Sequence, residues 1–421
     1  MIQVLSSSWA LYLGMFMLMI GNGLQGTLLG LRGDLEGFST FELSVIMSAY
    51  FVGFLFSSKL TPKLIRRVGH VRVFAALGST ISAVLILYPI LVEPWAWALG
   101  RVIIGFCFCG VYVTAESWLN DASTNATRGK ALSIYLMVQM AGIVAAQYIV
   151  SQGDISGYAL FIIPSVLVSL AFAPILLSIR PTPQFAQTKP MSIRRLIEAS
   201  PLGCVGMFLL GGVFSAQFGM SAVYGAQIGL SVGQISLFVS VIYIAALVAQ
   251  YPIGWLSDRI DRRILILIVG VVGGLGALVA FFIPGNFAVI LFSAAVLGGT
   301  SNPLYALLIA YTNDYLERED MAAASGGLLF INGIGAIAGP LTVGWMMESL
   351  GANGFWMFSA VLMLLLGVYA AYRMTRRSRS DLDHEGVSYV AVSSSSSPIV
   401  VEVAQEAYVD AEIEEEAQTK L

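Results

Sequence analysis

The densest group of ionisable residues in the hydrophobic part of this chain is Gly254–Arg263, which reads Gly-Trp-Leu-Ser-Asp-Arg-Ile-Asp-Arg-Arg. It ends one long apolar run and begins the next, so acidic side chains and arginines meet on a hairpin at a membrane edge. A partial copy, Pro62–Arg72, lies about half the hydrophobic domain earlier. A charged turn that recurs at a fixed place in two halves of such a chain predicts a duplicated transporter. We expect these turns to serve gating and not substrate recognition.

Two further ionisable residues, Arg101 and Glu116, lie inside one apolar run. A charge in hydrocarbon is costly, so each should face protein or water and have a role. At a rise of 1.5 Å per residue they are ~22 Å apart, so they cannot pair within one helix. Glu116 is expected near the turn that holds Arg66 and Arg67, either as a salt-bridge partner or as a protonatable gate. For Arg101 a structural or coupling role is favoured over contact with substrate.

Uncharged polar side chains are spread over the other apolar runs and could line a central cavity. Asn22 and Gln25 are three apart and therefore share a helix face, which would either line a cavity or hydrogen-bond a neighbouring helix. With Arg101 as the deep cation, a modestly polar or anionic solute is favoured over a cationic lipophile. The candidates for the cavity or for coupling are Arg101, Asn22, Gln25, Gln139, Gln217, Gln227, Gln250, Asn302 and Asn332.

The elements that position these residues are transmembrane helices. The 421 residues are 57% hydrophobic and 11% charged, with a mean hydropathy of +0.82, too apolar for a water-soluble surface. Windows of ~20 apolar residues predict an all-α membrane protein with about twelve spans. All Lys and Arg except Arg32 and Arg101 follow even-numbered spans, which predicts cytoplasmic termini. The expected spans are 8–30, 41–60, 72–92, 95–118, 130–151, 157–179, 201–225, 232–256, 263–283, 286–312, 322–346 and 353–373.

These spans divide into two halves. Residues 1–179 are expected to form one six-helix bundle and 201–373 a second, pseudo-symmetric one, joined by a cytoplasmic linker at 180–200 with three prolines. Residues 374–421 contain a serine run and many acidic residues and are expected to form a disordered acidic cytoplasmic tail. We expect a multi-pass monomer, with the lipid bilayer and a small-molecule substrate as its partners.

Residue types that would support an enzyme are scarce. The two histidines, His70 and His384, fall on the cytoplasmic side, and no metal-ligand cluster or nucleophile–base pair is present in the sequence. No phosphate-binding glycine-rich loop is found, which argues against an ATP-driven pump. Cys107, Cys109 and Cys204 lie in apolar runs and are interpreted as packed hydrophobes. We therefore expect no enzyme, no cofactor, no metal and no nucleic-acid partner.

The motifs resemble those of the major facilitator superfamily, and within it the YcaD-like branch of bacterial permeases, over residues 8–373. The family's loop signature is Gly-x-Leu-x-Asp-Arg-x-Gly-Arg-Arg. Asp261 stands in place of its second glycine, and in the first half Pro62 replaces the first glycine and Arg66 the acid. Arg101-x-x-x-Gly105 resembles a family motif linked to energy coupling. The matching signature residues are Gly254, Leu256, Asp258, Arg259, Arg262 and Arg263, with Leu64, Arg67, Gly69 and Arg72 in the partial copy.

The resemblance implies a secondary transporter that moves a small solute by alternating access. The signature acid would face the N-terminal end of a neighbouring helix, while the arginines pin helix ends and hold the cytoplasmic side shut. Because Arg66 replaces the acid in the first half, Glu116 is the candidate for the missing negative charge. Proton coupling is an open alternative with little support, because no carboxylate lies at mid-depth and Glu116 or Asp34 would have to serve from near the membrane surfaces. The alternatives are a drug or metabolite exporter, and a non-transporting sensor or scaffold that signals through the acidic tail.

Overall fold

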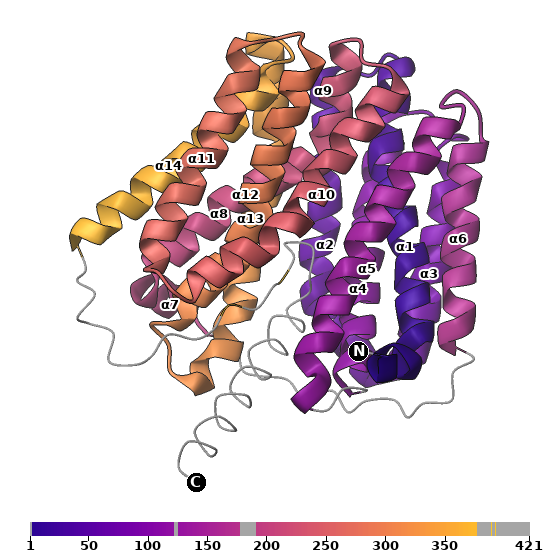
Figure 1. Ribbon diagram of the computed structural model, residues 1–421. Helices are drawn as coiled ribbons and strands as arrows, with labels where there is room; N and C mark the ends of the chain where they lie inside the picture. Colours follow the sequence, from indigo (N-terminus) through magenta and orange to yellow (C-terminus); the bar gives the residue numbers. More distant parts are fainter. Residues whose placement is uncertain (1, 122–124, 177–190, 377–388, 390–391, 393–421) are drawn as a thin grey trace.

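A computed structural model describes residues 2–121, 125–176, 191–376, 389 and 392, and within these ranges the protein is helical (Figure 1). Proline, glycine and short capped turns separate the helices. Ser39 and Ser231, for example, each close a reciprocal capping box with the residue three positions on. The helices are α1 (Ile2–Leu35), α2 (Thr40–Val68), α3 (His70–Leu87), α4 (Pro94–Asp121), α5 (Asn125–Gln152), α6 (Ala159–Leu176), α7 (Ile193–Ala199), α8 (Pro201–Ser215), α9 (Ser221–Gln227), α10 (Val232–Ser257), α11 (Arg262–Phe282), α12 (Phe287–Asn313), α13 (Arg318–Leu350) and α14 (Gly354–Arg376), with a π-helical segment at Ala216–Met220.

Eleven helices of the described chain are long and apolar enough to cross a membrane. The predicted sixth span corresponds to α6, which is apolar but shorter over its described residues, Ala159–Pro174. Large apolar side chains such as Trp95, Tyr251 and Phe282 are more than two-thirds exposed. This outward-facing apolar surface suits a lipid environment, and the chain is a multi-pass membrane protein.

The first charged turn differs from the sequence-based expectation. We expected a loop after residue 60, but α2 continues to Val68 and α3 begins at His70. Arg66 and Arg67 therefore lie in the last turn of a helix, where they complement its negative end. The connection is Gly69, whose φ of +88° is a conformation that glycine adopts without strain.

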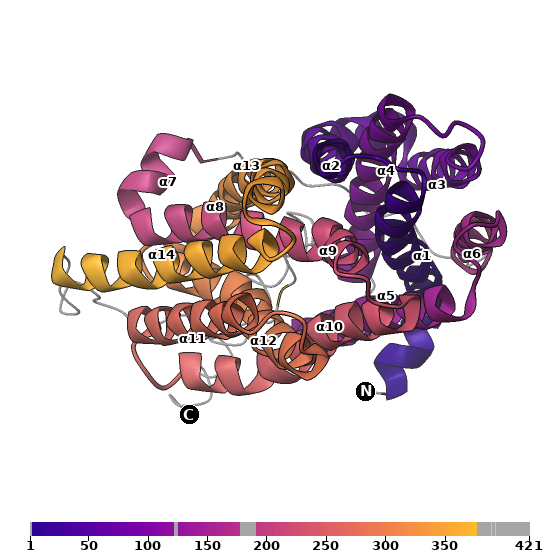
Figure 2. The same ribbon diagram turned by 90° about the horizontal axis from the view of Figure 1, so that it is seen from above.

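The helices gather into two groups, α1–α6 on one side and α7–α14 on the other (Figure 2). Matching pairs of long helices pack in both groups: α2 against α4 and α10 against α12, then α1 against α5 and α8 against α13. Glycines lie at these crossings. A Cβ on Gly105 would come within 1.9 Å of the Tyr50 carbonyl oxygen, and one on Gly298 within 2.3 Å of the Ile242 carbonyl oxygen. Such close backbone approach is possible only for residues without a side chain.

Across the two groups, α2 packs against α13 and α5 against α10. Polar contacts join the groups at the ends of α2 and α13, where the Phe41 N–H donates to Glu348 Oε1 at 3.0 Å. Nearby, Gln227 Nε2 donates to Thr40 Oγ1 at 2.7 Å. Figure 1 shows the groups meeting at the end near α9 and diverging toward the end near α7 and the N-terminus.

The predicted linker and tail are described only in part. Residues 177–190 and most of 377–421 lie outside the described residues. Within the linker, α7 is helical and docks on α13, since Arg195 pairs with Asp320 at 2.5 Å and the Met191 N–H donates to the Ala323 carbonyl oxygen. Of the tail beyond Arg376, Tyr389 and Val392 are described, and both pack against the core.

Candidate functional site

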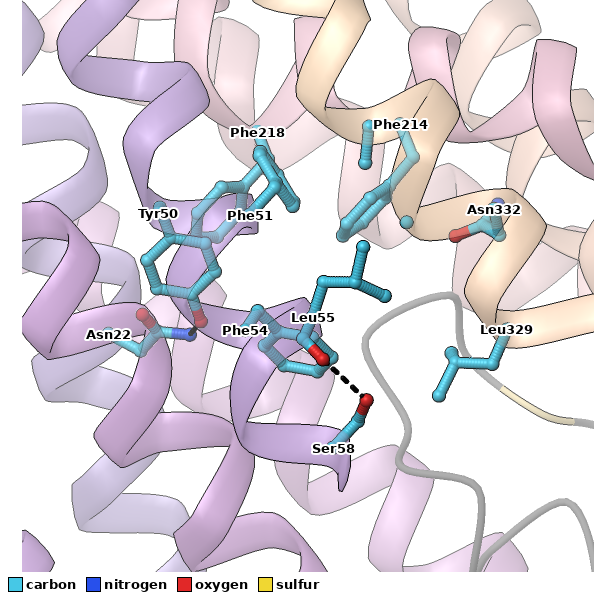
Figure 3. A pocket seen from close by; sticks show the side chains of 12 residues that line it. Asn22, Tyr50, Phe51, Phe54, Leu55, Ser58, Phe214, Phe218, Leu329 and Asn332 are labelled. Carbon is cyan, nitrogen blue, oxygen red and sulfur yellow. Dashed lines mark hydrogen bonds between the residues drawn. The ribbon is translucent and has the colours of Figure 1, made fainter. Parts of the chain in front are cut away.

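The described chain has a cavity between the two helix groups, with about 520 Å³ free of protein atoms and partly open to solvent. Most of its wall is aromatic or aliphatic, and Figure 3 shows the rings between one amide at each end. Helices α1 and α2 supply one wall, and α8, the π-helical segment and α13 the other. The lining residues are Asn22, Tyr50, Phe51, Phe54, Leu55, Ser58, Phe214, Phe218, Leu329, Asn332, Gly333 and Ala336.

The two amides of the cavity come from opposite groups of helices. Asn332 of α13 donates through Nδ2 to the Met207 carbonyl oxygen at 3.0 Å, and its side-chain oxygen points toward the cavity (Figure 3). Asn22 of α1 donates through Nδ2 to the Tyr112 hydroxyl at 2.8 Å. The cavity thus combines an apolar surface with hydrogen-bonding groups at its two ends.

Arg101 lies behind this cavity and does not line it. Its guanidinium is fully buried and donates to Gln25 Oε1 at 2.7 Å, while Gln25 Nε2 donates to Asn22 Oδ1 at 3.0 Å. The same guanidinium stacks over the Tyr50 ring, with 4.7 Å to the ring centroid. Asn22 and Gln25 therefore share a face as expected, and that face connects the buried cation to the cavity wall. A cation–π contact and a neutral amide stabilise this charge within the described chain.

Aromatic residues of the cavity were missed by the sequence analysis. Phe214 and Phe218 are stacked with 6.0 Å between centroids, and Phe218 also lies 5.4 Å from the Tyr50 ring across the two groups. A spacing of four residues on one helix was the available signal, but lipid-facing aromatics produce the same pattern. Phe218 is in the π-helical segment Ala216–Met220, a type of helix irregularity that is frequent at functional sites.

The other predicted cavity residues are dispersed. Gln217 is buried in the π-helical segment and donates through Nε2 to Ser301 Oγ of α12 at 2.9 Å. Asn302 donates to the Gly298 carbonyl oxygen of its own helix at 3.4 Å. Gln139 is buried on α5, whereas Gln227 is exposed and bonded to Thr40. Gln250 is half-buried on α10, and none of these five side chains is among those that line the cavity.

Glu116 is buried near the end of α4, with 2% exposure. Its carboxylate accepts a hydrogen bond from the Tyr135 hydroxyl of α5 at 3.0 Å. Arg66 and Arg67, the expected partners, are exposed, and neither forms an ion pair within the described chain. What the structure brings together is therefore a buried carboxylate and a phenol between α4 and α5.

The second charged turn fixes three helix ends. Arg262 is buried and pairs with Asp314 at the end of α12, while its Nη1 donates to the Ala310 carbonyl oxygen at 3.1 Å. Asp261 caps α11 by accepting from the Arg263 N–H at 2.9 Å, and its carboxylate pairs with the Arg263 guanidinium at 2.7 Å. The aspartate in place of the family's glycine thus acts as an N-cap. Arg259 is exposed and lies over the Trp255 ring at 4.1 Å.

Gly254 and Asp258, the remaining residues of this turn, contact the tail. The Tyr389 N–H donates to Asp258 Oδ1 at 2.8 Å, and a Cβ on Gly254 would come within 2.6 Å of the Tyr389 ring. Asp258 also lies 3.7 Å from the Arg262 guanidinium. Among the described residues, no group of three or more His, Cys, Asp and Glu is arranged to hold a metal ion.

Comparisons with known proteins agree with this architecture. The uncharacterised MFS-type transporter YcaD of Salmonella typhimurium is 25% identical over 344 residues, which are 81% of this chain and 88% of the relative. The uncharacterised MFS-type transporter Ent638_1421 of Enterobacter sp. strain 638 is 28% identical over 346 residues, with the same coverage.

Solved structures share the fold at low sequence identity. The nucleoside transporter NupG has a TM-score of 0.71 at 16% identity, covering 88% of this chain and all of that one. A bacterial homologue of the human lysosomal transporter Spinster, inward-facing and occupied, has a TM-score of 0.72 at 16% identity and covers 89% and 97%. FucP in the outward conformation has 0.56 at 13% identity and covers 86% and 97%. The family model described as Major Facilitator Superfamily matches residues 11–202 and again residues 202–398. The chain therefore belongs to the major facilitator superfamily of membrane transporters.

Proposed function

We propose that this protein is a secondary transporter that moves a small neutral solute, with a flat apolar face and a hydrogen-bonding edge, by alternating access. The observation that carries the proposal is the cavity between the two helix groups, with aromatic rings from both in contact and one amide from each. A solute held by both groups at once binds differently whenever they rearrange, which couples binding to movement.

Two pseudo-symmetric six-helix halves are supported by repeated packing. The α2–α4 and α10–α12 pairs both cross at a glycine, as do the α1–α5 and α8–α13 pairs, and the family model matches the chain twice. Each half is tightly packed within itself. The groups would then rock against each other as units, as the inverted and parallel repeats of transporters do.

The arrangement of the halves corresponds to a state open to the cytoplasm. Phe41–Glu348 and Gln227–Thr40 close the end that the distribution of basic residues assigns to the outside. The TM-score is higher with the inward-facing Spinster homologue than with FucP in the outward conformation. Both termini would be cytoplasmic, in the inner membrane of a bacterium, and the protein would act as a monomer.

The lining of the cavity narrows the class of solute. The sequence favoured a modestly polar or anionic solute because Arg101 was expected at the cavity. Arg101 instead lies behind Tyr50 and Gln25, and among the described residues that line the cavity the phenol of Tyr50 is the one ionisable group. Stacked rings and amides suit a neutral aromatic or heteroaromatic solute. Nucleosides are reasonable first probes, given the similarity to the nucleoside transporter NupG.

Proton coupling, if present, would use Glu116. It is the buried carboxylate of α4, and the Tyr135 hydroxyl that donates to it connects α4 with α5. A change in the protonation of Glu116 changes the charge between these two helices, which would link proton binding to their rearrangement. Uptake into proteoliposomes that is equal with and without a pH gradient would exclude this coupling.

The proposal is tested by a thermal-shift screen of the purified protein against neutral heteroaromatic metabolites at two pH values, followed by uptake into proteoliposomes. For a solute that stabilises the wild type, Asn332→Ala should weaken the binding affinity about tenfold, because a buried hydrogen bond contributes ~1 kcal/mol or more. Gln152→Ala, at an exposed amide far along α5, is the matched control. A solute that binds equally well to Asn332→Ala and to the wild type does not use this cavity.

A second function, a sensor that signals through its tail, is favoured by one observation: Tyr389 and Val392 pack against the transmembrane core. Export of drugs or metabolites uses the same cavity in the opposite direction. Truncation after residue 379 separates sensor from transporter, because a transporter keeps its flux and a sensor loses its output. Counterflow in right-side-out and inverted vesicles separates import from export.

A further inference from the structure

The tail residue Tyr389 occupies a specific place on the helix group α7–α14. Its backbone N–H donates to Asp258 Oδ1 at 2.8 Å, and its hydroxyl donates to the Pro303 carbonyl oxygen of α12 at 3.3 Å. Its ring lies on the backbone of Gly254 in α10. Three contacts, from two helices and a turn, thus hold the residue Tyr389. Val392, three positions later in the sequence, is also buried, with 3% exposure.

The geometry of this contact depends on the lack of a side chain at Gly254. A Cβ there would lie 2.6 Å from Cδ1 and 2.8 Å from Cε1 of the Tyr389 ring, far inside ordinary van der Waals contact. Burial and the neighbouring Asp258 carboxylate raise the pKa of the Tyr389 phenol, so the ring remains neutral at physiological pH, as a packed group should. The surface therefore accepts a flat neutral ring together with the backbone N–H of the same residue.

This surface faces the other helix group. Helix α10, which carries Gly254, packs against α5 of the other group. In the alternating access proposed above, closing the cytoplasmic end would bring the two groups together and reduce the space beside α10.

We propose that the surface formed by Gly254, Asp258 and Pro303 is a docking site for the Tyr389 segment of the chain's own tail, and that the docked tail is a brake that holds the cytoplasmic side open. The brake rests on the proposed alternating access, while the docking does not. Asp258 is the acid of the signature turn, and with Tyr389 bound its Oδ1 is engaged by the tail. Tyr389 must therefore dissociate before the Asp258 carboxylate can take part in closing the cytoplasmic side.

The docking is tested by binding of a fluorescent peptide with the sequence of residues 385–396 to purified protein truncated after residue 379. Fluorescence anisotropy should show saturable binding at up to about millimolar peptide, since a short tether supplies an effective concentration in that range. The same peptide with Tyr389→Ala should bind at least tenfold more weakly, and Gly254→Val in the truncated protein should reduce binding as strongly. Equal binding of the two peptides would overturn the docking.

The brake is tested by flux. The initial uptake rate should rise at least twofold after truncation and by a similar factor in full-length Tyr389→Ala, whereas Tyr408→Ala, at a tyrosine later in the tail, should leave it unchanged. Adding the peptide to the truncated protein should return the rate to its original value. Peptide binding without any change in the uptake rate would refute the brake. Peptide binding to a protein that shows no detectable transport would refute the proposed transport function, while the docking proposal would stand.

Discussion

Gly105 offers the sharpest test of how the first half is built. It belongs to the Arg101-x-x-x-Gly105 motif, and a Cβ there would lie 1.9 Å from the Tyr50 carbonyl oxygen and 2.8 Å from its carbonyl carbon. Ordinary contact begins at 3.4 Å, so Gly105→Ala requires α2 and α4 to separate by about 1.5 Å. The obstacle is backbone, which cannot turn aside as a flexible side chain does.

The size of the effect follows from two opposing terms. Overpacking costs about 1–3 kcal/mol, and forcing two backbones apart belongs at the upper end. Alanine returns up to about 1 kcal/mol in helix propensity. The net loss of about 2 kcal/mol should lower the midpoint of thermal unfolding by about 4–8 °C for a half of this size. Because Tyr50 lines the cavity, affinity for a transported solute should also fall.

Gly326→Ala is the matched control. Gly326 lies in α13, and a Cβ there would meet nothing within 4 Å, so only the gain in helix propensity remains. Intrinsic tryptophan fluorescence of both variants in detergent, followed during heating, gives the comparison. A Gly105→Ala protein that unfolds at or above the wild-type midpoint would refute the close α2–α4 crossing.

Three further predictions concern the charged turn and the buried carboxylate Glu116. Arg262→Ala should lower the midpoint of thermal unfolding by at least 6 °C, because removing one partner of a buried ion pair costs about 3–5 kcal/mol. Arg259→Ala, at an exposed arginine of the same turn, should change the midpoint little. Equal shifts in the two variants would contradict the role of Arg262 in fixing the end of α12. Asp261→Ala should destabilise by about 1 kcal/mol through loss of the α11 cap, and Asp261→Gly by less, as measured by urea or thermal unfolding; a neutral alanine variant would show that the cap is unimportant. Glu116→Gln should abolish stimulation of uptake by a pH gradient while leaving counterflow intact, and unchanged stimulation would remove Glu116 from any coupling.

Much of the helical architecture could be predicted from the sequence because membrane spans are read from composition alone. One difference was local: α2 runs on through Pro62 to Val68, and Gly69 with its positive φ ends it. The residues that make up the cavity were harder to predict from the sequence. The three-residue spacing predicted that Asn22 and Gln25 share a face. The sequence offered Arg101 as a cavity or coupling candidate and favoured a structural or coupling role, and the structure places it behind Tyr50, bonded to Gln25.

The aromatic wall could not be predicted for a physical reason. A phenylalanine that faces lipid and one that faces a cavity satisfy the same composition and periodicity, and only the contact between the two groups distinguishes Phe218 from Phe292. The tail contact was hidden for a similar reason. Tyr389 lies in a polar, acidic region that predicts solvation, and its place depends on the absence of a side chain at Gly254, far away in sequence.

The π-helical segment Ala216–Met220 has one more consequence. One additional residue within a helix turns everything beyond it by about 100° and advances it by about 1.5 Å. Sliding this irregularity by a single position would rotate Phe218 out of the stack with Phe214 while α8 and the far end of α9 keep their places. A shift of the π-helical segment along the helix would thus free the Phe218 ring through a local exchange of backbone hydrogen bonds, without bending the helix and without moving a whole half.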